Sequence, residues 1–191
     1  MKNKLVLASA SPRRLDLLKQ IGLIPDQVIP ADIDEAHGKT ELPRDYALRM
    51  AIEKARAVSA PGSFILAADT VVAVGRRILP KTETEAQARQ CLTLLSGRRH
   101  TVYNGIAVMT PKGVLKTRLC ETTVKFHRLD SADMEDYVTS GEWQGKAGGY
   151  AIQGLAAAFI PYIGGSYATV VGLSLYDTLQ ILKGAGFWAS Q

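Results

Sequence analysis

The sequence contains few cysteines and no long uninterrupted hydrophobic segment. Only two of its 191 residues are cysteines, Cys91 and Cys120, and they do not form a CxxC pair. A disulfide scaffold and a cysteine-ligated zinc site are therefore not expected, whereas a reducing compartment is. Pro161 and six glycines interrupt the uncharged segment 147–176, and Ser11-Pro12-Arg13-Arg14 ends the short N-terminal apolar run. We therefore expect a cytoplasmic protein with neither a membrane span nor a signal peptide.

Several familiar catalytic and nucleotide-binding motifs are also missing. The chain has no GxxxxGK[ST], GxGxxG, HExxH or GxSxG sequence. Its three histidines, His37, His100 and His127, are scattered along the chain. The sequence therefore predicts neither a histidine metal cluster nor a Ser-His-Asp triad.

The composition is that of a folded, basic protein. Charged residues make up 21% of the chain and hydrophobic residues 47%, which excludes a disordered chain. The net charge is +5, and residues 1–100 carry the whole excess. This excess suggests an anionic partner, either a nucleic acid, a membrane surface or a phosphorylated small molecule, although a basic protein without such a partner fits equally well. The length predicts one domain, residues 1–191.

The pattern of apolar residues, caps and turns predicts an α/β domain around a mixed sheet. Strands are expected at 5–7, at 64–74 and between 101 and 129, with a turn at 110–113. Helices are expected at 12–21, with Ser11 as N-cap, and at 43–59, 131–139 and 174–183. Another helix would open with a capping box of Thr82 and Glu85 and end at Gly97. Segments 155–163 and 167–171 are interpreted as a hairpin around Gly164-Gly165.

A candidate anion site lies where the first predicted strand leads into the first helix. Free N–H groups and the helix dipole favour an anion there, whereas Arg13 and Arg14 oppose the positive end of the dipole. A bound anion would remove this conflict, and the hydroxyls of Ser9 and Ser11 could donate to it. Alternatively, both arginines point into solvent or pair with Asp16.

Other candidates are ionisable residues next to apolar ones. Lys54 falls on the apolar stripe of the helix at 43–59, where it either extends to solvent or serves a site. Asp69 lies in the apolar strand at 64–74, where a carboxylate is costly unless paired or metal-bound; alternatively, the strand ends at Ala68. The acidic segment 32–35 is by itself a solvated loop, but Glu35 could hold a divalent ion together with Asp69. Lys81 is by itself an ordinary surface lysine.

The glycine-rich segment 148–154 would let a ligand approach the backbone closely. Gln153 within it carries a donor and an acceptor side by side, which match the edge of a nucleobase.

Taken together, these segments resemble the Maf family of nucleoside triphosphate pyrophosphatases over nearly the whole chain. The matching segments are, in chain order, Leu7-Ala8-Ser9-x-Ser11-Pro12-Arg13-Arg14, Asp32-Ile33-Asp34-Glu35, Glu53-Lys54-Ala55-Arg56, Ala68-Asp69-Thr70, Leu94-Leu95-Ser96-Gly97, Lys146-Ala147-Gly148-x-Tyr150-x-Ile152-Gln153-Gly154, Gly165-Ser166-Tyr167 and Val171-Gly172-Leu173. The resemblance implies a Maf/Ham1-like (ITPase-like) fold, in which a long mixed β-sheet with flanking helices floors a cleft between two lobes. It also implies a cytoplasmic, dimeric enzyme that uses a divalent cation (Mg²⁺, Mn²⁺ or Co²⁺) to convert a nucleoside triphosphate to the monophosphate and pyrophosphate.

The resemblance further implies roles for individual residues. Asp69 would be the proton acceptor and, with Glu35, a metal ligand. Arg13, Thr70 and Gln153 would discriminate between substrates, and Gln153 resembles the branch that prefers dTTP and UTP, because the 7-methyl-GTP branch has glutamate there. The expected phosphate-binding residues are Ser9, Ser11, Arg13, Arg14, Lys54 and Lys81.

Two positions depart from the family pattern. The family usually has Lys-Pro where this chain has Lys81-Thr82, and Gly-Leu-Pro where it has Gly172-Leu173-Ser174. We expect both changes to affect local backbone stiffness rather than chemistry.

Two other functions stay open at this point. One is a nucleotide-binding regulator of cell division without catalysis, because the family has been linked to septum formation. The other is a nucleic-acid-binding domain, suggested by the net charge. We expect instead a homodimer that binds a nucleoside triphosphate and forms no membrane contact and no stable nucleic-acid complex. The basic residues would converge on one triphosphate, and the uncharged segment 147–176 would supply sheet core and dimer surface.

Overall fold

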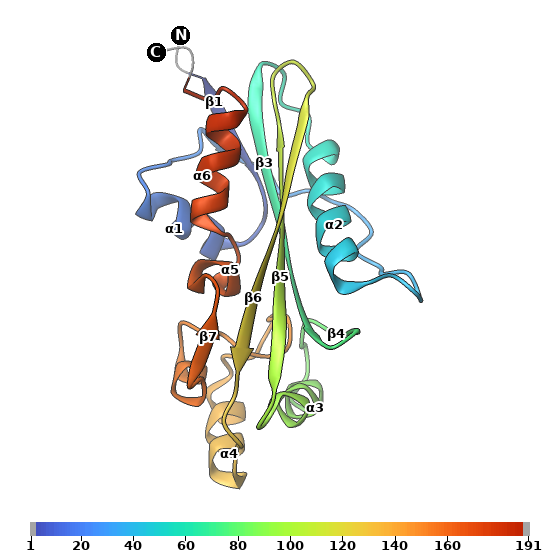
Figure 1. Cartoon of the computed structure of the whole chain (residues 1–191), viewed down its shortest axis with the longest axis vertical. Helices are drawn as coiled ribbons and strands as arrows, with labels where there is room; N and C mark the ends of the chain where they lie inside the picture. The colour runs from blue at the N-terminus through green and yellow to red at the C-terminus, as the bar shows by residue number, and fades with distance from the viewer. Residues whose placement is uncertain (1–2, 189–191) are drawn as a thin grey trace.

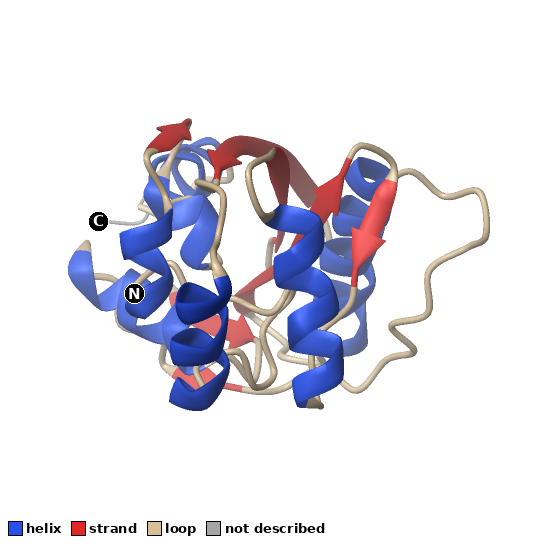
Figure 2. Ribbon diagram, turned by 90° about the horizontal axis from the view of Figure 1, so that it is seen from below, coloured by secondary structure: helices blue, strands red, loops and turns tan. Residues whose placement is uncertain are grey.

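A computed structural model describes residues 3–188, which form a seven-stranded mixed sheet with helices on both faces (Figures 1 and 2). The strands are β1 (Lys4–Ala8), β2 (Gln27–Val28), β3 (Ser63–Val74), β4 (Arg77–Leu79), β5 (Arg99–Met109), β6 (Leu115–Lys125) and β7 (Tyr162–Gly164). Their order is β2-β1-β3-β5-β6-β7, with β4 paired to β3. β1 is parallel to β2 and β3, and all other pairs are antiparallel.

The helices are α1 (Pro12–Gln20), α2 (Pro43–Ala57), α3 (Glu85–Leu95), α4 (Ser131–Ser140), α5 (Tyr167–Val171) and α6 (Leu175–Gly184), with a 3₁₀ helix, η1, at Leu155–Phe159. None of the helices within residues 3–188 has the length and apolarity needed to span a bilayer.

Both faces of the sheet are covered near β1. Alternate residues of β1 and β3, such as Leu7 and Leu66, pack against α1 and α6, while their neighbours Val6 and Ile65 pack against α2. Figure 1 shows α2 on one side of the long strands and α1 and α6 on the other. Because both faces are buried, these strands appear in the sequence as continuous apolar runs rather than as an alternation.

The three longest strands extend beyond this region into a second lobe. There, β3, β5 and β6 pack against α3, α4 and η1 through a separate core that includes Val72, Leu92, Tyr137 and Phe159. One continuous sheet therefore supports two lobes, as the family resemblance implies (Figure 1).

The expected strands and most of the expected helices are confirmed, but the hairpin is wrong. Segment 155–163 contains η1 and only the short strand β7, and segment 167–171 is the helix α5. β7 pairs with β6 instead, because Gly165, at φ +132°, lies close against Thr122 of β6 and turns the chain into α5.

Two capping predictions are also corrected. The capping box of α3 is formed by Thr84 and Gln87, two residues beyond the predicted pair of Thr82 and Glu85. Thr82 is buried and donates its hydroxyl hydrogen to the carbonyl of Trp143 at 2.6 Å. Because this contact occupies Thr82, Thr84 is the residue that caps α3. Ser11 occupies the N-cap position of α1, but its side chain makes no capping hydrogen bond.

Gly105 of β5 allows α2 to approach the sheet closely. It lies opposite Asp69 in the β3–β5 register and faces α2. A Cβ at this position would overlap the carbonyl of Ala47 and lie 2.9 Å from the Cα of Leu48. The missing side chain thus sets the distance between α2 and the segment of β3 that carries Asp69.

We predict that Gly105→Ala lowers the free energy of unfolding by roughly 1–3 kcal/mol, because the overlapping atoms belong to helix backbone. Urea denaturation measures this change. Gly184→Ala is the matched control, since nothing lies within 4 Å of a Cβ there and alanine favours a helix. Equal stabilities of Gly105→Ala and Gly184→Ala would contradict the close approach.

Candidate active site

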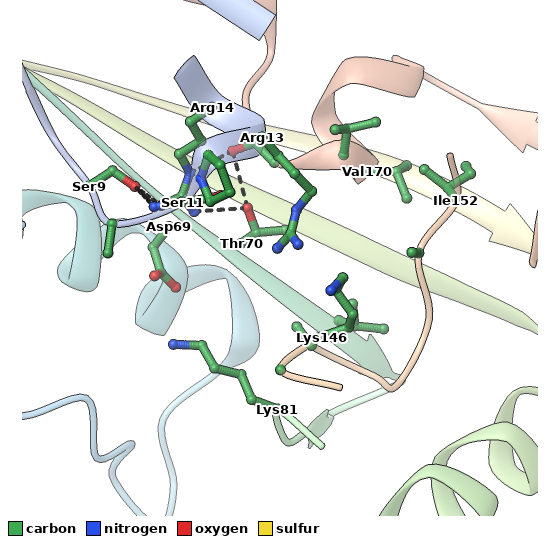
Figure 3. Close-up of a pocket in the computed structure, with 18 of the residues that line it drawn as sticks. Ser9, Ser11, Arg13, Arg14, Asp69, Thr70, Lys81, Lys146, Ile152 and Val170 are labelled. Carbon is green, nitrogen blue, oxygen red and sulfur yellow. Dashed lines mark hydrogen bonds between the residues drawn. The ribbon is translucent and has the colours of Figure 1, made fainter. Parts of the chain in front are cut away.

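A pocket of about 360 Å³ lies between the two lobes. Its walls come from the β1–α1 junction, α2, β3, the loop before α2, the end of β4 and segments 145–153 and 170–172 (Figure 3). All ten residues predicted for the site line this pocket: Ser9, Ser11, Arg13, Arg14, Glu35, Lys54, Asp69, Thr70, Lys81 and Gln153.

A buried lysine connects two carboxylates at the inner end of the pocket. Lys54 of α2 lies with its Nζ 2.6 Å from Oδ1 of Asp69 and 2.7 Å from Oε1 of Glu35. β3 continues through Asp69 to Val74, so the alternative that the strand ends at Ala68 is wrong. Alternation along β3 directs Asp69 to the α2 face, where Lys54 follows Ala47 by two helical turns.

Glu35 is shared between two lysines. Its other carboxylate oxygen, Oε2, lies 2.5 Å from Nζ of Lys81. Burial opposes ionisation of Glu35, but hydrogen bonds from Lys54 and Lys81 outweigh this effect and lower its pKa to about 2. The loop that carries Glu35 is thereby attached to both α2 and the end of β4.

Arg14 is held on the opposite face of β3. Its guanidinium donates to Oγ of Ser9 at 2.9 Å, to Oγ1 of Thr70 at 3.3 Å and to the carbonyl of Gly172 at 2.9 Å. Burial lowers the pKa of Arg14, and the negative charge of Asp69 counteracts this effect. The alternative of a pair with Asp16 is wrong, because Asp16 pairs with Lys19.

Arg13 and Gln153 line the more open part of the pocket. Arg13 is half-buried, and burial lowers its pKa. Gln153 is exposed and follows Ile152, which lies across the pocket from Asp69 in Figure 3. Ser11 lines the pocket, and its hydroxyl oxygen accepts no capping hydrogen bond from α1, while its backbone N–H donates to Oγ of Ser9 at 3.2 Å.

Sequence reasoning assigned no role to two residues of this region. Asn104 of β5 is fully buried; its amide donates to the carbonyls of Asp69 and Gly172 and to Oγ1 of Thr70, and its oxygen accepts from the N–H of Ser174. Lys146 lines the pocket from the second lobe. In the sequence, Asn104 could have been identified as a single amide side chain within a largely apolar strand. Lys146 was noted only as part of the segment Lys146-Ala147-Gly148, which matches the family pattern.

Both departures from the family pattern supply backbone donors that proline lacks. The N–H of Thr82 donates to the carbonyl of Lys146 at 3.1 Å, and the N–H of Ser174 donates to Asn104 at 3.0 Å. The first hydrogen bond attaches the segment after β4 to the segment that carries Lys146, and the second attaches the start of α6 to β5.

The carboxylates of Glu35 and Asp69 fit a divalent cation in their donor chemistry. Both already converge on one positive charge, the ammonium of Lys54. Mg²⁺ is commonly held by one or two carboxylates together with substrate phosphate oxygens and water. Within residues 3–188 no group of three or more His, Cys, Asp or Glu side chains is placed to hold a metal without such additional ligands.

Comparisons with known proteins identify the relatives of this chain. The sequence model described as "Maf-like protein" matches residues 4–185. The chain is 62% identical to a dTTP/UTP pyrophosphatase of Caulobacter vibrioides, over 96% of both chains. It is 60% identical to a dTTP/UTP pyrophosphatase of Paramagnetospirillum magneticum, over 96% of this chain and 97% of the relative. A solved HAM1 protein from Coxiella burnetii, at 20% identity, superposes with a TM-score of 0.50 over 95% of this chain and 99% of that one, a likeness of fold.

The ion pairs of Glu35 predict a pH-dependent contribution to stability. The pKa of about 2 in the folded protein lies below the unfolded value, which is about 4.3. The contribution is therefore fully present above the unfolded pKa and is lost as the pH falls towards the folded one. We expect Glu35→Gln to be less stable than the wild type at pH 7 and the difference to shrink below roughly pH 4.

Urea denaturation of both proteins from neutral to acidic pH measures this difference. Glu121→Gln is the control, because Glu121 is exposed and forms no ion pair within the described part of the chain. A difference between wild type and Glu35→Gln that is as large at pH 3 as at pH 7 would refute the assignment.

Proposed function

This chain belongs to the Maf family, and we propose that it hydrolyses dTTP, UTP and modified pyrimidine triphosphates to the monophosphate and pyrophosphate. The observation that carries the proposal is the convergence of Arg13, Arg14, Lys54 and Lys81 on one pocket around Asp69. The names of the two relatives at 62% and 60% identity support the choice of substrate.

Asp69 accepts the proton of the water molecule that attacks the α-phosphorus. A new P–O bond forms, the bond between the α-phosphorus and the bridging oxygen breaks, and pyrophosphate leaves with the electron pair. The arginines and lysines stabilise the negative charge that develops on the phosphates. Arg14 is well suited to this because hydrogen bonds to Ser9, Thr70 and Gly172 hold its guanidinium in place before substrate binds.

Glu35 and Asp69 would hold the divalent cation, and Lys54 would then release part of its contact with them. When bound, such a cation neutralises phosphate charge and lowers the pKa of water.

Gln153 supplies base recognition at the exposed end of the pocket. Its amide oxygen accepts from N3–H of uracil or thymine, and its NH₂ donates to O4. Cytosine lacks that N3–H and carries an amino group in place of O4, so CTP fits less well. Arg13 and Thr70 would assist this selection from the neighbouring wall.

We also propose a cytoplasmic homodimer. Both cysteines are free, as expected in a reducing compartment. Tyr162, Tyr167 and Tyr176 are large apolar residues exposed at 48%, 48% and 71%, and they lie in the uncharged part of the chain. Such residues favour contact with a second copy.

The proposal is tested by measuring pyrophosphate release from a panel of nucleoside triphosphates, including modified pyrimidines, with Mg²⁺, Mn²⁺ and Co²⁺. We expect dTTP and UTP to be the best canonical substrates. Asp69→Asn should lower kcat for dTTP by about 100-fold or more, because it removes the general base. Asp136→Asn, an exposed residue of α4, is the control. Unchanged turnover in Asp69→Asn would refute its role, and no release from any triphosphate would favour a non-catalytic regulator.

We predict that Gln153→Glu lowers kcat/KM for dTTP and UTP by roughly 10-fold or more, because a carboxylate cannot donate to O4. Steady-state kinetics with dTTP, UTP and CTP measure this loss. Gln90→Glu on the exposed face of α3 adds the same charge outside the pocket and should leave kcat/KM unchanged. A Gln153→Glu variant that keeps its preference for dTTP over CTP would rule out the proposed base contact.

A further inference from the structure

Three cationic side chains of the pocket, Arg13, Arg14 and Lys146, have no carboxylate partner within residues 3–188, but neutral acceptors on Ser9, Thr70 and Gly172 hold the guanidinium of Arg14. Within the described range of the chain, neither Arg13 nor Lys146 forms an ion pair, and Nζ of Lys146 donates only to the backbone carbonyl of Gln144, at 3.0 Å. Lys54 and Lys81, in contrast, are both neutralised by Glu35. Of the five pocket cations, Lys54 and Lys81 are therefore paired with carboxylates, Arg14 is held by neutral acceptors, and Arg13 and Lys146 form the uncompensated pair.

The uncompensated pair is electrostatically unfavourable without a ligand. Burial lowers the pKa of Lys146, the positive charge of Arg13 lowers it further, and Glu142 opposes this effect. Glu142 is engaged elsewhere, since its carboxylate accepts from the N–H of Leu155 at 2.8 Å. Burial also lowers the pKa of Arg13. An anion bound between Arg13 and Lys146 would stabilise the charged form of both.

The backbone fixes the position of Lys146 relative to the rest of the site. Its carbonyl accepts from the N–H groups of Thr82 and Gly149 at 3.1 and 3.0 Å, and a β-bridge joins Ala147 to Lys81. Lys146 and Lys81 are therefore attached to the same pair of segments. In Figure 3, Lys81 extends towards Asp69, whereas Lys146 lies on the side of Arg13 and Thr70.

This arrangement divides the pocket into three regions. In Figure 3, Ile152 lies at one end, Arg13 and Lys146 come next, and Asp69 and Lys81 lie beyond them. Gln153 follows Ile152 in the chain, and Lys54 is paired with Asp69. A nucleotide with its base beside Ile152 and Gln153 would have its α-phosphate between Arg13, Lys146 and Asp69 and its terminal phosphates towards Lys81.

We propose that Lys146 and Arg13 bind the α-phosphate, the phosphate that remains with the nucleoside monophosphate. The inference rests on the proposed function and refines it by assigning a substrate-binding role to Lys146. Charge-assisted hydrogen bonds from both side chains reach the α-phosphate from the two lobes. Lys81 binds the terminal phosphates that leave as pyrophosphate, whereas Lys54 stays paired with Asp69 beside the α-phosphate. Lys146 and Lys81 therefore act on different products.

Binding of the separate products tests this division. Isothermal titration calorimetry at constant Mg²⁺ would measure thymidine, dTMP and inorganic pyrophosphate against wild type, Lys146→Met and Lys81→Met. We expect Lys146→Met to raise the Kd of dTMP about tenfold or more and to leave the Kd values of thymidine and pyrophosphate within about twofold. Lys81→Met should show the reverse pattern for dTMP and pyrophosphate.

Two further variants serve as controls. Lys146→Arg keeps the charge and should bind dTMP nearly as tightly as the wild type. Lys112→Met removes an exposed lysine in the turn between β5 and β6 and should change no Kd. Methionine keeps most of the apolar stem of Lys146, and the backbone bonds of Lys146 do not depend on its side chain.

The outcomes separate this inference from the proposed function. A wild type that binds neither dTMP nor pyrophosphate would overturn both. A wild type that binds both, with Lys146→Met weakening them equally or weakening neither, would overturn only the role of Lys146. An equal loss of thymidine and dTMP binding in Lys146→Met would place this side chain on the nucleoside instead of the phosphate.

Discussion

The ammonium of Lys54, buried between Asp69 and Glu35, is the interaction on which the site depends. A buried charge is stable only when it is paired at close range, and here two carboxylates from different segments satisfy one lysine. The contact requires α2 to lie close to β3, which Gly105 permits by leaving room for the helix backbone. The close packing of α2 against the sheet therefore also determines the distance between Lys54 and Asp69 in the site.

Asp69 and Thr70 are consecutive residues that organise opposite faces of the sheet. The side chain of Asp69 contacts Lys54 on the α2 face, while Thr70 contacts Arg14 on the α1 face. Asn104, opposite Thr70 in the register, connects this second face to Gly172 and Ser174. The amide of Asn104 therefore holds three segments together, which explains the presence of a fully buried polar residue in an apolar strand.

The pocket combines restrained and unrestrained cations. Lys54, Lys81 and Arg14 are fixed by protein partners, whereas Arg13 and Lys146 have no acidic partner within residues 3–188. Fixed cations need little rearrangement when charge develops during a reaction. Unpaired cations, in contrast, gain most from an incoming anion. The use of one sheet as the floor of both lobes brings these two classes of side chain into a single pocket.

The sequence by itself determined most of the elements and several candidate residues, because apolar periodicity and buried charges are local signals, whereas Thr70 and Lys81 became candidates only through the family resemblance. Lys54 on an apolar stripe and Asp69 in an apolar strand could be identified from their neighbours alone. Only the tertiary structure decided how they pair, since it brings Glu35 against Lys54. The tertiary structure also decided the cap of α3, because Thr82 is buried against Trp143 instead of capping the helix. The same holds for Lys146 and Asn104 and for the failed hairpin, where contacts with distant strands override local preference.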